Sequence, residues 1–258
     1  MKVVILCGGQ GTRLREETEF RPKPLVEIGG RPILLHIMKL YAHHGFTEFI
    51  LCLGYKGTMI KEFFLNYEEM NNDFTIALGS KRRIHHHGAH DEEGLTVTLA
   101  DTGPDSMTGA RIKAIEKYVD GDTFMVTYGD GVSDVDLRAL LAFHQSHGRL
   151  ATVTTVRPIS RFGALELDPT GAVSAFNEKP RLEGWINTGF MVFERGVFEY
   201  LSKQPSCVLE QEPLQNLARD GQLVAYRHEG FFFAMDTYRE LKHLNQLWDS
   251  GTAPWKVW

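Results

Sequence analysis

The sequence predicts an α/β protein built on a mixed, mostly parallel sheet with helices on both faces. Two observations predict this class. Short apolar runs of the kind that form buried strands alternate with helical patterns through the first half of the chain, and such alternation is typical of a parallel sheet. The second half adds segments that pattern as antiparallel strands, so we expect a mixed sheet.

The first half supplies four expected strands and three expected helices. The strands are the apolar runs at residues 3–7, 48–53, 123–128 and 151–156. The helices are expected at residues 33–44, 58–67 and 134–147. In the first helix apolar residues recur every three or four positions, and Gly45 is placed to end it.

The second half opens with an expected antiparallel hairpin. Its strands are residues 163–167 and 172–177, on either side of a turn at residues 168–171. Two more strands, one helix between them and a closing helix are expected at residues 186–194, 223–228, 209–219 and 238–248. Residues 74–100, polar in their middle, are expected to form a β-hairpin arm that projects from the sheet. Because neither a repeat nor a linker interrupts the pattern, residues 1–258 are expected to form a single domain.

Composition bounds the functional classes. Of the 258 residues, 43% are hydrophobic and 24% are charged, as in ordinary globular proteins, and the net charge of −5 argues against a general nucleic-acid binder. No apolar stretch is long enough to cross a bilayer, and the run after Met1 is too short for a signal peptide. The three cysteines lie far apart and suggest no disulfide framework, so we expect a cytoplasmic protein without nucleic-acid or membrane partners.

The strongest local motif is a glycine-rich segment directly after the first strand. Such a turn lets backbone N–H groups approach an anion closely. The segment reads Gly8-Gly9-Gln10-Gly11-Thr12-Arg13. It lacks the Gly-Lys-Ser/Thr of the Walker motif, and Leu14 stands where the dinucleotide fingerprint has its third glycine. We therefore expect a phosphate loop of another type, with an ordinary strand–helix turn as the alternative.

A lysine flanked by prolines follows ten residues after Arg13. Pro22 and Pro24 are expected to hold Lys23 in a stiff extended segment in which no helix forms. A lysine held in this way is a preorganised positive charge. The alternative is a surface linker, which the nearby glycine-rich loop disfavours.

Together these two motifs resemble the signature of the sugar nucleotidyltransferases, the nucleoside-diphosphate-sugar pyrophosphorylases. Residues 26–33, 128–134, 176–180 and 187–190 resemble further motifs of that family, so the resemblance spans nearly the whole chain. It implies a Rossmann-like nucleotide-diphospho-sugar transferase fold and an enzyme that joins a nucleoside triphosphate to a sugar 1-phosphate. It implies a nucleotide site formed by Leu6, Gly8, Gly9, Gln10, Gly11, Thr12, Arg13, Lys23, Ser106, Arg111, Gly129 and Asp130.

Within the family, residues 97–103, 106–112 and 253–258 are similar to the glucose-1-phosphate cytidylyltransferases. This similarity implies CTP and α-D-glucose 1-phosphate as substrates and CDP-glucose as product, a precursor of deoxysugars in surface polysaccharides. Two features depart from that branch. Gln10 stands near the base where an apolar residue is frequent, and Phe232-Phe233 replaces an expected Trp-Gln. The same chemistry with UTP or dTTP therefore stays open.

The implied reaction is in-line attack by a sugar-phosphate oxygen on the α-phosphorus, which needs charge neutralisation and alignment rather than a nucleophilic side chain. The resemblance assigns catalysis to Arg13, which holds the triphosphate, and Lys23, which contacts the α-phosphate. Asp130 follows the expected strand that ends near residue 128, and Asp236 follows a further expected strand at residues 231–235. Both are expected to hold Mg²⁺ as cofactor, although a turn aspartate is the alternative for each.

The resemblance also implies a sugar-phosphate site and a quaternary structure. The sugar-phosphate residues it implies are Gly163, Glu178, Lys179 and Asn187. It implies a homo-oligomer as well, and the arm at residues 74–100 is where we expect contacts between copies.

Three other functions are weighed against this one. A nucleotide-sugar glycosyltransferase would use the Asp134-Val135-Asp136 motif, but it has no use for Arg13 or Lys23. A dinucleotide-dependent oxidoreductase is disfavoured by the broken fingerprint. A catalytically silent regulatory subunit on the same fold should lack at least one of four key residues. All four are present, namely Arg13, Lys23, Asp130 and Asp236.

Overall fold

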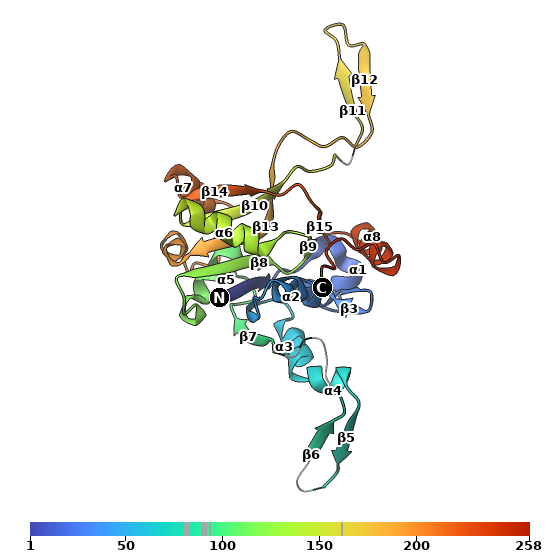
Figure 1. The fold of residues 1–258 in the computed structure, drawn as a ribbon, viewed down its shortest axis with the longest axis vertical. Coiled ribbons are helices and arrows are strands. Elements are labelled where there is room, and N and C mark those ends of the chain that lie inside the picture. Colours follow the sequence, from blue (N-terminus) through green and yellow to red (C-terminus); the bar gives the residue numbers. More distant parts are fainter. Residues whose placement is uncertain (80–82, 89–91, 93, 161) are drawn as a thin grey trace.

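A seven-stranded mixed sheet forms the centre of the molecule (Figure 1). The computed structural model describes residues 1–79, 83–88, 92, 94–160 and 162–258. In spatial order the strands are β14 (Leu223–Arg227), β10 (Ala151–Val156), β13 (Ile186–Glu194), β8 (Thr123–Tyr128), β1 (Lys2–Cys7), β4 (Glu48–Leu53) and β7 (Thr96–Asp101). Strand β13 runs antiparallel to both of its neighbours, and the other six share one direction. The expected mixed, mostly parallel sheet is confirmed.

Helices cover both faces of this sheet. Those of the described residues are α1 (Arg15–Thr18), α2 (Ile33–His43), α3 (Gly57–Leu65), α4 (Tyr67–Asn71), α5 (Thr108–Ala114), α6 (Leu137–His147), α7 (Glu212–Arg219) and α8 (Tyr238–Asp249). Short 3₁₀ turns are η1 (Thr12–Leu14), η2 (Lys23–Leu25), η3 (Glu116–Tyr118) and η4 (Arg195–Tyr200). None of these helices has both the length and the apolar character needed to cross a bilayer.

The central strands are buried on both sides, which explains their continuous apolar sequences. In β1 the side chains of Val3, Ile5 and Cys7 join one core, with α2, α3, α6 and α8. The alternate side chains Val4 and Leu6 join a second core, with α5 and α7. Each face therefore carries its own apolar cluster, as the period of two along a strand requires.

The described residues also form four small two-stranded sheets. They pair β2 (Glu27–Ile28) with β3 (Arg31–Pro32), β5 (Phe74–Ala77) with β6 (Arg83–His86), β9 (Gly131–Ser133) with β15 (Phe232–Ala234), and β11 (Ala164–Leu167) with β12 (Val173–Asn177). The pairs β5–β6 and β11–β12 project from opposite ends of the body (Figure 1). The sequence predicted the β11–β12 hairpin, but only the β5–β6 segment was expected to project.

The structure differs from the sequence-based expectation at three places. Residues 96–100 belong to β7 of the main sheet, so the first arm is shorter than predicted, and residues 80–82, 89–91 and 93 of that arm lie outside the described residues. The helix expected from residue 134 begins at Leu137, because the Asp136 side chain caps it by accepting from Arg138 N and Ala139 N, both at 2.9 Å.

The third difference concerns Lys23. The extended segment expected around it is wrong, because residues Lys23–Leu25 form a 3₁₀ turn in which Leu25 N donates to Pro22 O at 2.8 Å. Pro24 tolerates the turn because the missing N–H of a proline is not needed in the first turn of a helix. Pro22 itself stays extended, with φ −66° and ψ 147°.

Candidate active site

The site lies where the strand order of the sheet diverges. From β1 the chain adds β4 and β7 on one side and later returns to place β8 on the other side. Ligands of open α/β sheets bind at such a switch point, outside the carboxyl ends of the strands. The glycine-rich loop follows β1 and Asp130 follows β8, so the topology brings both to this point.

The glycine-rich loop is hydrogen-bonded to α1 on one side and exposed to solvent on the other. The buried hydroxyl of Thr18 donates to Gly11 O at 3.0 Å and to Leu14 O at 2.9 Å, which ties the loop to α1. Residues Gly9, Gln10 and Thr12 lie exposed at its rim. The loop can therefore present its backbone to an anion without having to unfold.

Lys23 binds the two predicted metal ligands. Its Nζ lies 2.6 Å from Asp130 Oδ2 and 2.8 Å from Asp236 Oδ1. Arg13 adds a second cation, with Nη1 2.9 Å from Asp236 Oδ2. The side chains of Lys23, Asp130 and Asp236 are largely shielded from solvent, and that of Lys23 is only 11% exposed. The Arg13 side chain, in contrast, is 70% exposed.

The environment keeps Lys23 charged. Burial alone would lower the pKa of its ammonium group, but the Asp130 and Asp236 carboxylates outweigh that effect and raise this pKa above its ordinary value. The ammonium is therefore a fixed positive charge across the neutral pH range.

The backbone directly before Asp130 packs closely against the end of β1. Gly129 N donates to Leu6 O at 3.0 Å, which places Asp130 beside the end of β1. A Cβ atom on Gly129 would lie 2.9 Å from that same oxygen, so any larger residue would push β8 away from β1. Asp130 is therefore held at the switch point by a contact that requires glycine.

Asp236 is oriented by the start of α8. The Glu240 Oε2 atom accepts from Asp236 N and Thr237 N, both at 2.8 Å, and Thr237 Oγ1 accepts from Glu240 N in a capping box. Sequence reasoning missed Glu240. The Thr-x-x-Glu pattern directly after Asp236 is the signal that could have found it.

The two carboxylates fit a divalent cation that substrate phosphates complete. They converge on one positive centre, the Lys23 ammonium, so both can face a single cation. Among the described residues, no cluster of three or more His, Cys, Asp or Glu side chains could hold a metal alone. Mg²⁺ is commonly bound by one or two carboxylates with water and substrate phosphates, which matches this donor set.

Arg111 lies deeper than the sequence suggested. Its guanidinium is buried and donates to five oxygens of the protein. These acceptors are Leu53 O, Thr102 Oγ1, Gly103 O, Gly8 O and Pro104 O. Arg111 thus joins the glycine-rich loop to the segment before α5 that carries the half-buried Ser106. That it reaches the nucleotide stays a prediction.

We call the ion-paired residues Arg13, Lys23, Asp130 and Asp236 the Lys23 cluster, and the predicted sugar-phosphate residues lie outside it. Asn187 lies at the start of β13, where its Oδ1 accepts from Gly189 N at 2.8 Å. Glu178 and Lys179 are exposed where the chain leaves β12, with Lys179 Nζ 3.8 Å from Glu178 Oε1. Gly163 directly precedes β11. No hydrogen bond or ion pair among the described residues joins these three to Lys23, Asp130 or Asp236.

The Asp-x-Asp motif of the glycosyltransferase alternative has structural partners instead. Asp134 Oδ1 accepts from Phe231 N at 2.7 Å and from His228 Nε2 at 2.8 Å. Asp136 caps α6. Both carboxylates already hold backbone groups in place, so this arrangement does not favour a metal-binding pair.

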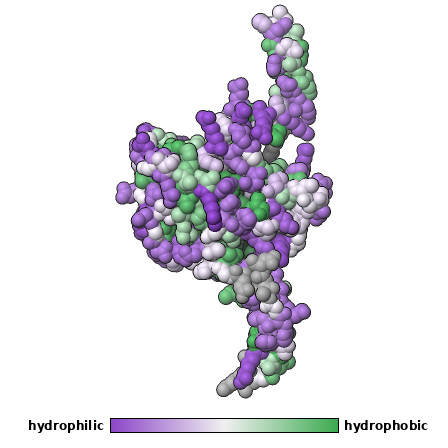
Figure 2. All heavy atoms as spheres, viewed as in Figure 1, coloured by the Kyte–Doolittle hydropathy of each residue, from purple (hydrophilic) through white to green (hydrophobic). Residues whose placement is uncertain are grey.

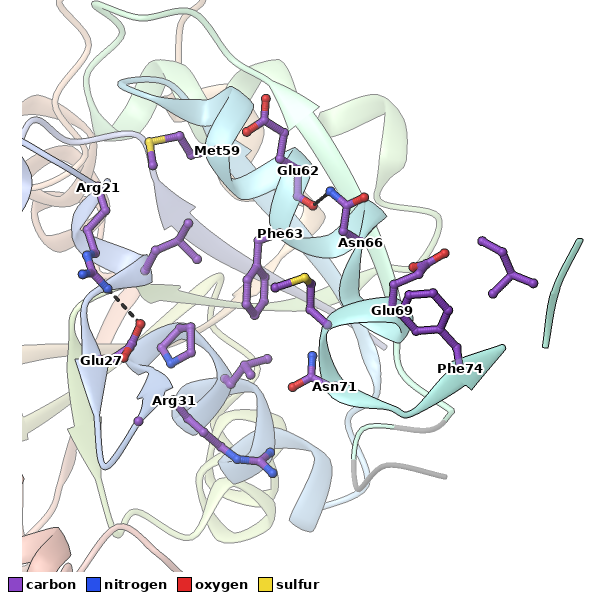
Figure 3. A pocket seen from close by; sticks show the side chains of 16 residues that line it. Arg21, Glu27, Arg31, Met59, Glu62, Phe63, Asn66, Glu69, Asn71 and Phe74 are labelled. Carbon is purple, nitrogen blue, oxygen red and sulfur yellow. Dashed lines mark hydrogen bonds and ion pairs between the residues drawn. The ribbon is translucent and has the colours of Figure 1, made fainter. Parts of the chain in front are cut away.

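A large hollow has a lining that does not include the residues of the Lys23 cluster. It has a volume of about 960 Å³ and is lined by residues of α2, α3, α4 and the strands β2, β3, β5 and β6, among others (Figure 3). Apolar side chains such as Met59 and Phe63 line it, and Arg21 Nη1 donates to Glu27 Oε1 at 2.8 Å on its wall. None of Arg13, Lys23, Asp130 and Asp236 lines this hollow, so size alone does not locate the chemistry here.

Comparison with known proteins identifies the family. A family model described as nucleotidyl transferase matches residues 2–231. The chain belongs to the nucleotidyl transferase family. It is 49% identical, over the full length of both chains, to the glucose-1-phosphate cytidylyltransferase of Salmonella typhi. It is 46% identical, again over both full lengths, to a probable glucose-1-phosphate cytidylyltransferase of Bacillus subtilis. The expected family and the expectation of a transferase enzyme are confirmed.

Solved structures agree with the fold. The HddC protein of Yersinia pseudotuberculosis aligns with a TM-score of 0.66 at 22% identity, covering 96% of this chain and 99% of HddC. A UDP-glucose pyrophosphorylase in complex with UDP-glucose aligns with a TM-score of 0.69 at 14% identity, covering 97% of this chain and 98% of the other. The overall architecture of this nucleotidyl transferase is therefore shared with these two proteins despite low sequence identity.

Proposed function

We propose that this nucleotidyl transferase joins CTP to α-D-glucose 1-phosphate, giving CDP-glucose and pyrophosphate. The observation that carries the proposal is the contact of Lys23 with both Asp130 and Asp236 at the switch point of the sheet. The full-length identity of 49% to a glucose-1-phosphate cytidylyltransferase supports the choice of substrates. The departures at Gln10 and Phe233 leave UTP and dTTP as alternatives to CTP.

The reaction forms one bond and breaks one. An oxygen of the sugar 1-phosphate attacks the α-phosphorus of CTP, and the bond from that phosphorus to the bridging oxygen breaks in line, so pyrophosphate leaves with the electron pair. The attacking oxygen is already anionic, so no side chain has to remove a proton. The protein supplies alignment and positive charge.

Individual residues take separate parts of this task. The backbone of the glycine-rich loop and the exposed guanidinium of Arg13 hold the triphosphate. Lys23 contacts the α-phosphate and balances the charge that builds up on it. Glu178, Lys179 and Asn187 bind the sugar 1-phosphate, which for Glu178 and Lys179 requires the β11–β12 hairpin to approach a nucleotide site.

Family members generally use a divalent metal, and we propose Mg²⁺ for this one. Asp130 and Asp236 would hold it together with phosphate oxygens of CTP. When bound, Mg²⁺ would supply Lewis-acid stabilisation of the phosphate charge. Lys23 would then exchange its carboxylate partners for the α-phosphate.

We also propose that the enzyme acts in the cytoplasm as a homo-oligomer. The cysteines of the described residues are free, and Cys7 and Cys52 are buried, as expected in a reducing compartment. On the β11–β12 hairpin the side chains of Leu165, Phe176 and Phe162 are 53%, 64% and 78% exposed, and Figure 2 shows hydrophobic residues along this arm. Two-stranded hairpins are marginal alone, so a second copy of the chain is the partner that we expect to cover it.

The substrate assignment is tested by pyrophosphate release with Mg²⁺, glucose 1-phosphate and each of CTP, UTP, dTTP, ATP and GTP. Release with CTP alone is the expected result, and mass spectrometry should then identify CDP-glucose. Faster release with another nucleotide would keep the mechanism and overturn the assignment of the base. No release with any of the five would contradict the proposed activity on glucose 1-phosphate.

A further inference from the structure

A two-stranded ladder connects the two proposed metal ligands. Strand β9 follows Asp130 directly, and β15 ends two residues before Asp236. The two strands pair antiparallel, Phe232 with Ser133 and Ala234 with Gly131. At the active-site end, Met235 N donates to Asp130 O at 2.9 Å. The ladder therefore sets the separation of the two carboxylates that Lys23 bridges.

The opposite end of this ladder is closed by the carboxylate of Asp134. Its Oδ1 atom accepts from Phe231 N at 2.7 Å and from His228 Nε2 at 2.8 Å. Ser133 Oγ donates to Phe231 O at 2.7 Å, so both the N–H and the carbonyl of Phe231 are held. We call the contacts of Asp134, His228, Ser133 and the Phe231 backbone the Asp134 latch.

The lack of a side chain at Gly230 leaves space for the Asp134 and His228 side chains of the latch. A Cβ atom on Gly230 would lie 2.4 Å from Asp134 Oδ1 and 2.6 Å from His228 Cε1. Any side chain at residue 230 would therefore displace the carboxylate or the imidazole. The His228 backbone is fixed in turn, because its N–H donates to Thr155 O of β10 at 2.8 Å. The latch thus anchors the ladder to the main sheet.

We propose that Asp134 is a positioning residue, which holds Asp130 and Asp236 at the spacing needed to share one divalent cation. The inference rests on the proposed function, in which these two carboxylates bind Mg²⁺. Without the Asp134 carboxylate, Phe231 N and His228 Nε2 lose this acceptor, and Phe231 is then held at this end of the ladder through contacts of its carbonyl oxygen, such as those with Ser133 Oγ and Asp134 N. Strand β15 can then shift against β9, and the two metal-binding carboxylates separate. A preorganised pair of ligands binds a cation more tightly than a mobile pair, because less ordering is required on binding.

The test measures metal binding without turnover. Mn²⁺ is titrated into the enzyme saturated with a CTP analogue that carries a methylene bridge between its α- and β-phosphorus atoms, and free Mn²⁺ is followed by electron paramagnetic resonance. Asp134→Ala should weaken Mn²⁺ binding about tenfold. Asp134→Asn keeps an acceptor oxygen and should stay within about threefold of wild type.

A matched control lies two residues away. Asp136→Ala removes the same charge and a cap of α6, so it should lower thermal stability and leave Mn²⁺ affinity unchanged. In steady state, Asp134→Ala should raise the Mg²⁺ concentration for half-maximal activity much more than it lowers kcat at saturating Mg²⁺. If Asp134→Ala does not fold, Gly230→Ala retains every charge and should weaken Mn²⁺ binding similarly.

The possible outcomes are distinct. Wild-type Mn²⁺ affinity in folded Asp134→Ala or Gly230→Ala overturns the latch and leaves the proposed function standing. An equal loss in Asp136→Ala also overturns it, because the effect would then follow from charge alone. If the wild-type complex with the CTP analogue binds no Mn²⁺, the metal role of Asp130 and Asp236 is refuted, and the role of the latch with it.

Discussion

At the residue scale, the Lys23 cluster contributes little to stability, and under the proposed function its ion pairs exchange partners when substrate binds. A sheltered ion pair gains little net stability, because desolvation offsets most of the attraction between the charges. Here one ammonium contacts two carboxylates, and Arg13 contacts one of them from the solvent side. When an anionic substrate arrives with a divalent cation, each partner can be replaced by another of the same sign.

His36 is a buried histidine whose contacts require one neutral form. Its Nε2 atom donates to Ile28 O at 2.9 Å, so Nδ1 is the nitrogen that accepts from Trp255 Nε1 at 3.3 Å. A proton on Nδ1 would face the indole N–H. Burial lowers the pKa of His36 to about 4, although its backbone hydrogen bonds oppose that shift.

The enzyme should therefore lose stability in mild acid. Below pH 6.5 a histidine of the unfolded chain takes up a proton, whereas folded His36 does so only near pH 4. Because the unfolded state binds more protons in this window, the free energy of unfolding falls as the pH falls through it. Between pH 7 and pH 5, His36 is expected to lower the free energy of unfolding by about 2 kcal/mol.

Urea unfolding at pH 7 and pH 5 checks this value. His36→Gln should remove about 2 kcal/mol from the pH dependence, even if the variant is less stable at pH 7. His43→Gln is the control, because His43 lies exposed on the same helix. Equal pH dependence in wild type and His36→Gln would show that this histidine does not carry the effect.

At the element scale, the strands could be predicted because strands buried on both faces have continuous apolar sequences. The apolar runs of β1, β4, β8 and β10 lie in the sheet where the pattern placed them. The glycine-rich loop and Asp130 could also be placed, since parallel strands end at one edge of a sheet. The choice of Lys23 and Asp236 as site residues followed from the family resemblance, and their ion pairing was not predicted.

Other elements depended on contacts that sequence patterns do not encode. The turn at Lys23 forms despite two prolines, because neither proline has to donate a hydrogen bond there. Residues 96–100 were included in the expected arm because the middle of residues 74–100 is polar, yet they pair with β4 as part of the edge strand of the sheet. The structural role of Arg111, whose five acceptors join two loops, could not be predicted from its sequence motif, and its contact with the nucleotide stays a prediction.

At the scale of the whole molecule, two hairpins extend from one body (Figure 1). Leu165 and Phe176 are cross-strand partners on the β11–β12 arm and share one face of it. Their exposure motivates the proposed homo-oligomer, and the arm also carries Glu178 and Lys179 at its foot. Assembly would therefore hold part of the proposed sugar site in a fixed position.

The oligomer is checked by size-exclusion chromatography with light scattering at micromolar concentration. Wild type should have a mass that is a multiple of 29.2 kDa, and Leu165→Ser combined with Phe176→Ser should lower it. Tyr118→Ser, at an exposed site in η3, is the control and should leave the mass unchanged. A monomeric wild-type enzyme, or an unchanged mass in the double variant, would count against the proposal.

The most direct measurement of the central claim is the rate of pyrophosphate release from CTP and glucose 1-phosphate, at saturating Mg²⁺, by wild type and Lys23→Met. The account predicts that kcat falls at least about 100-fold, since this charge is offered to the transition state. Lys117→Met, which changes an exposed lysine, should keep the wild-type rate. A folded Lys23→Met enzyme with wild-type turnover would contradict the claim that the Lys23 cluster is the reaction centre.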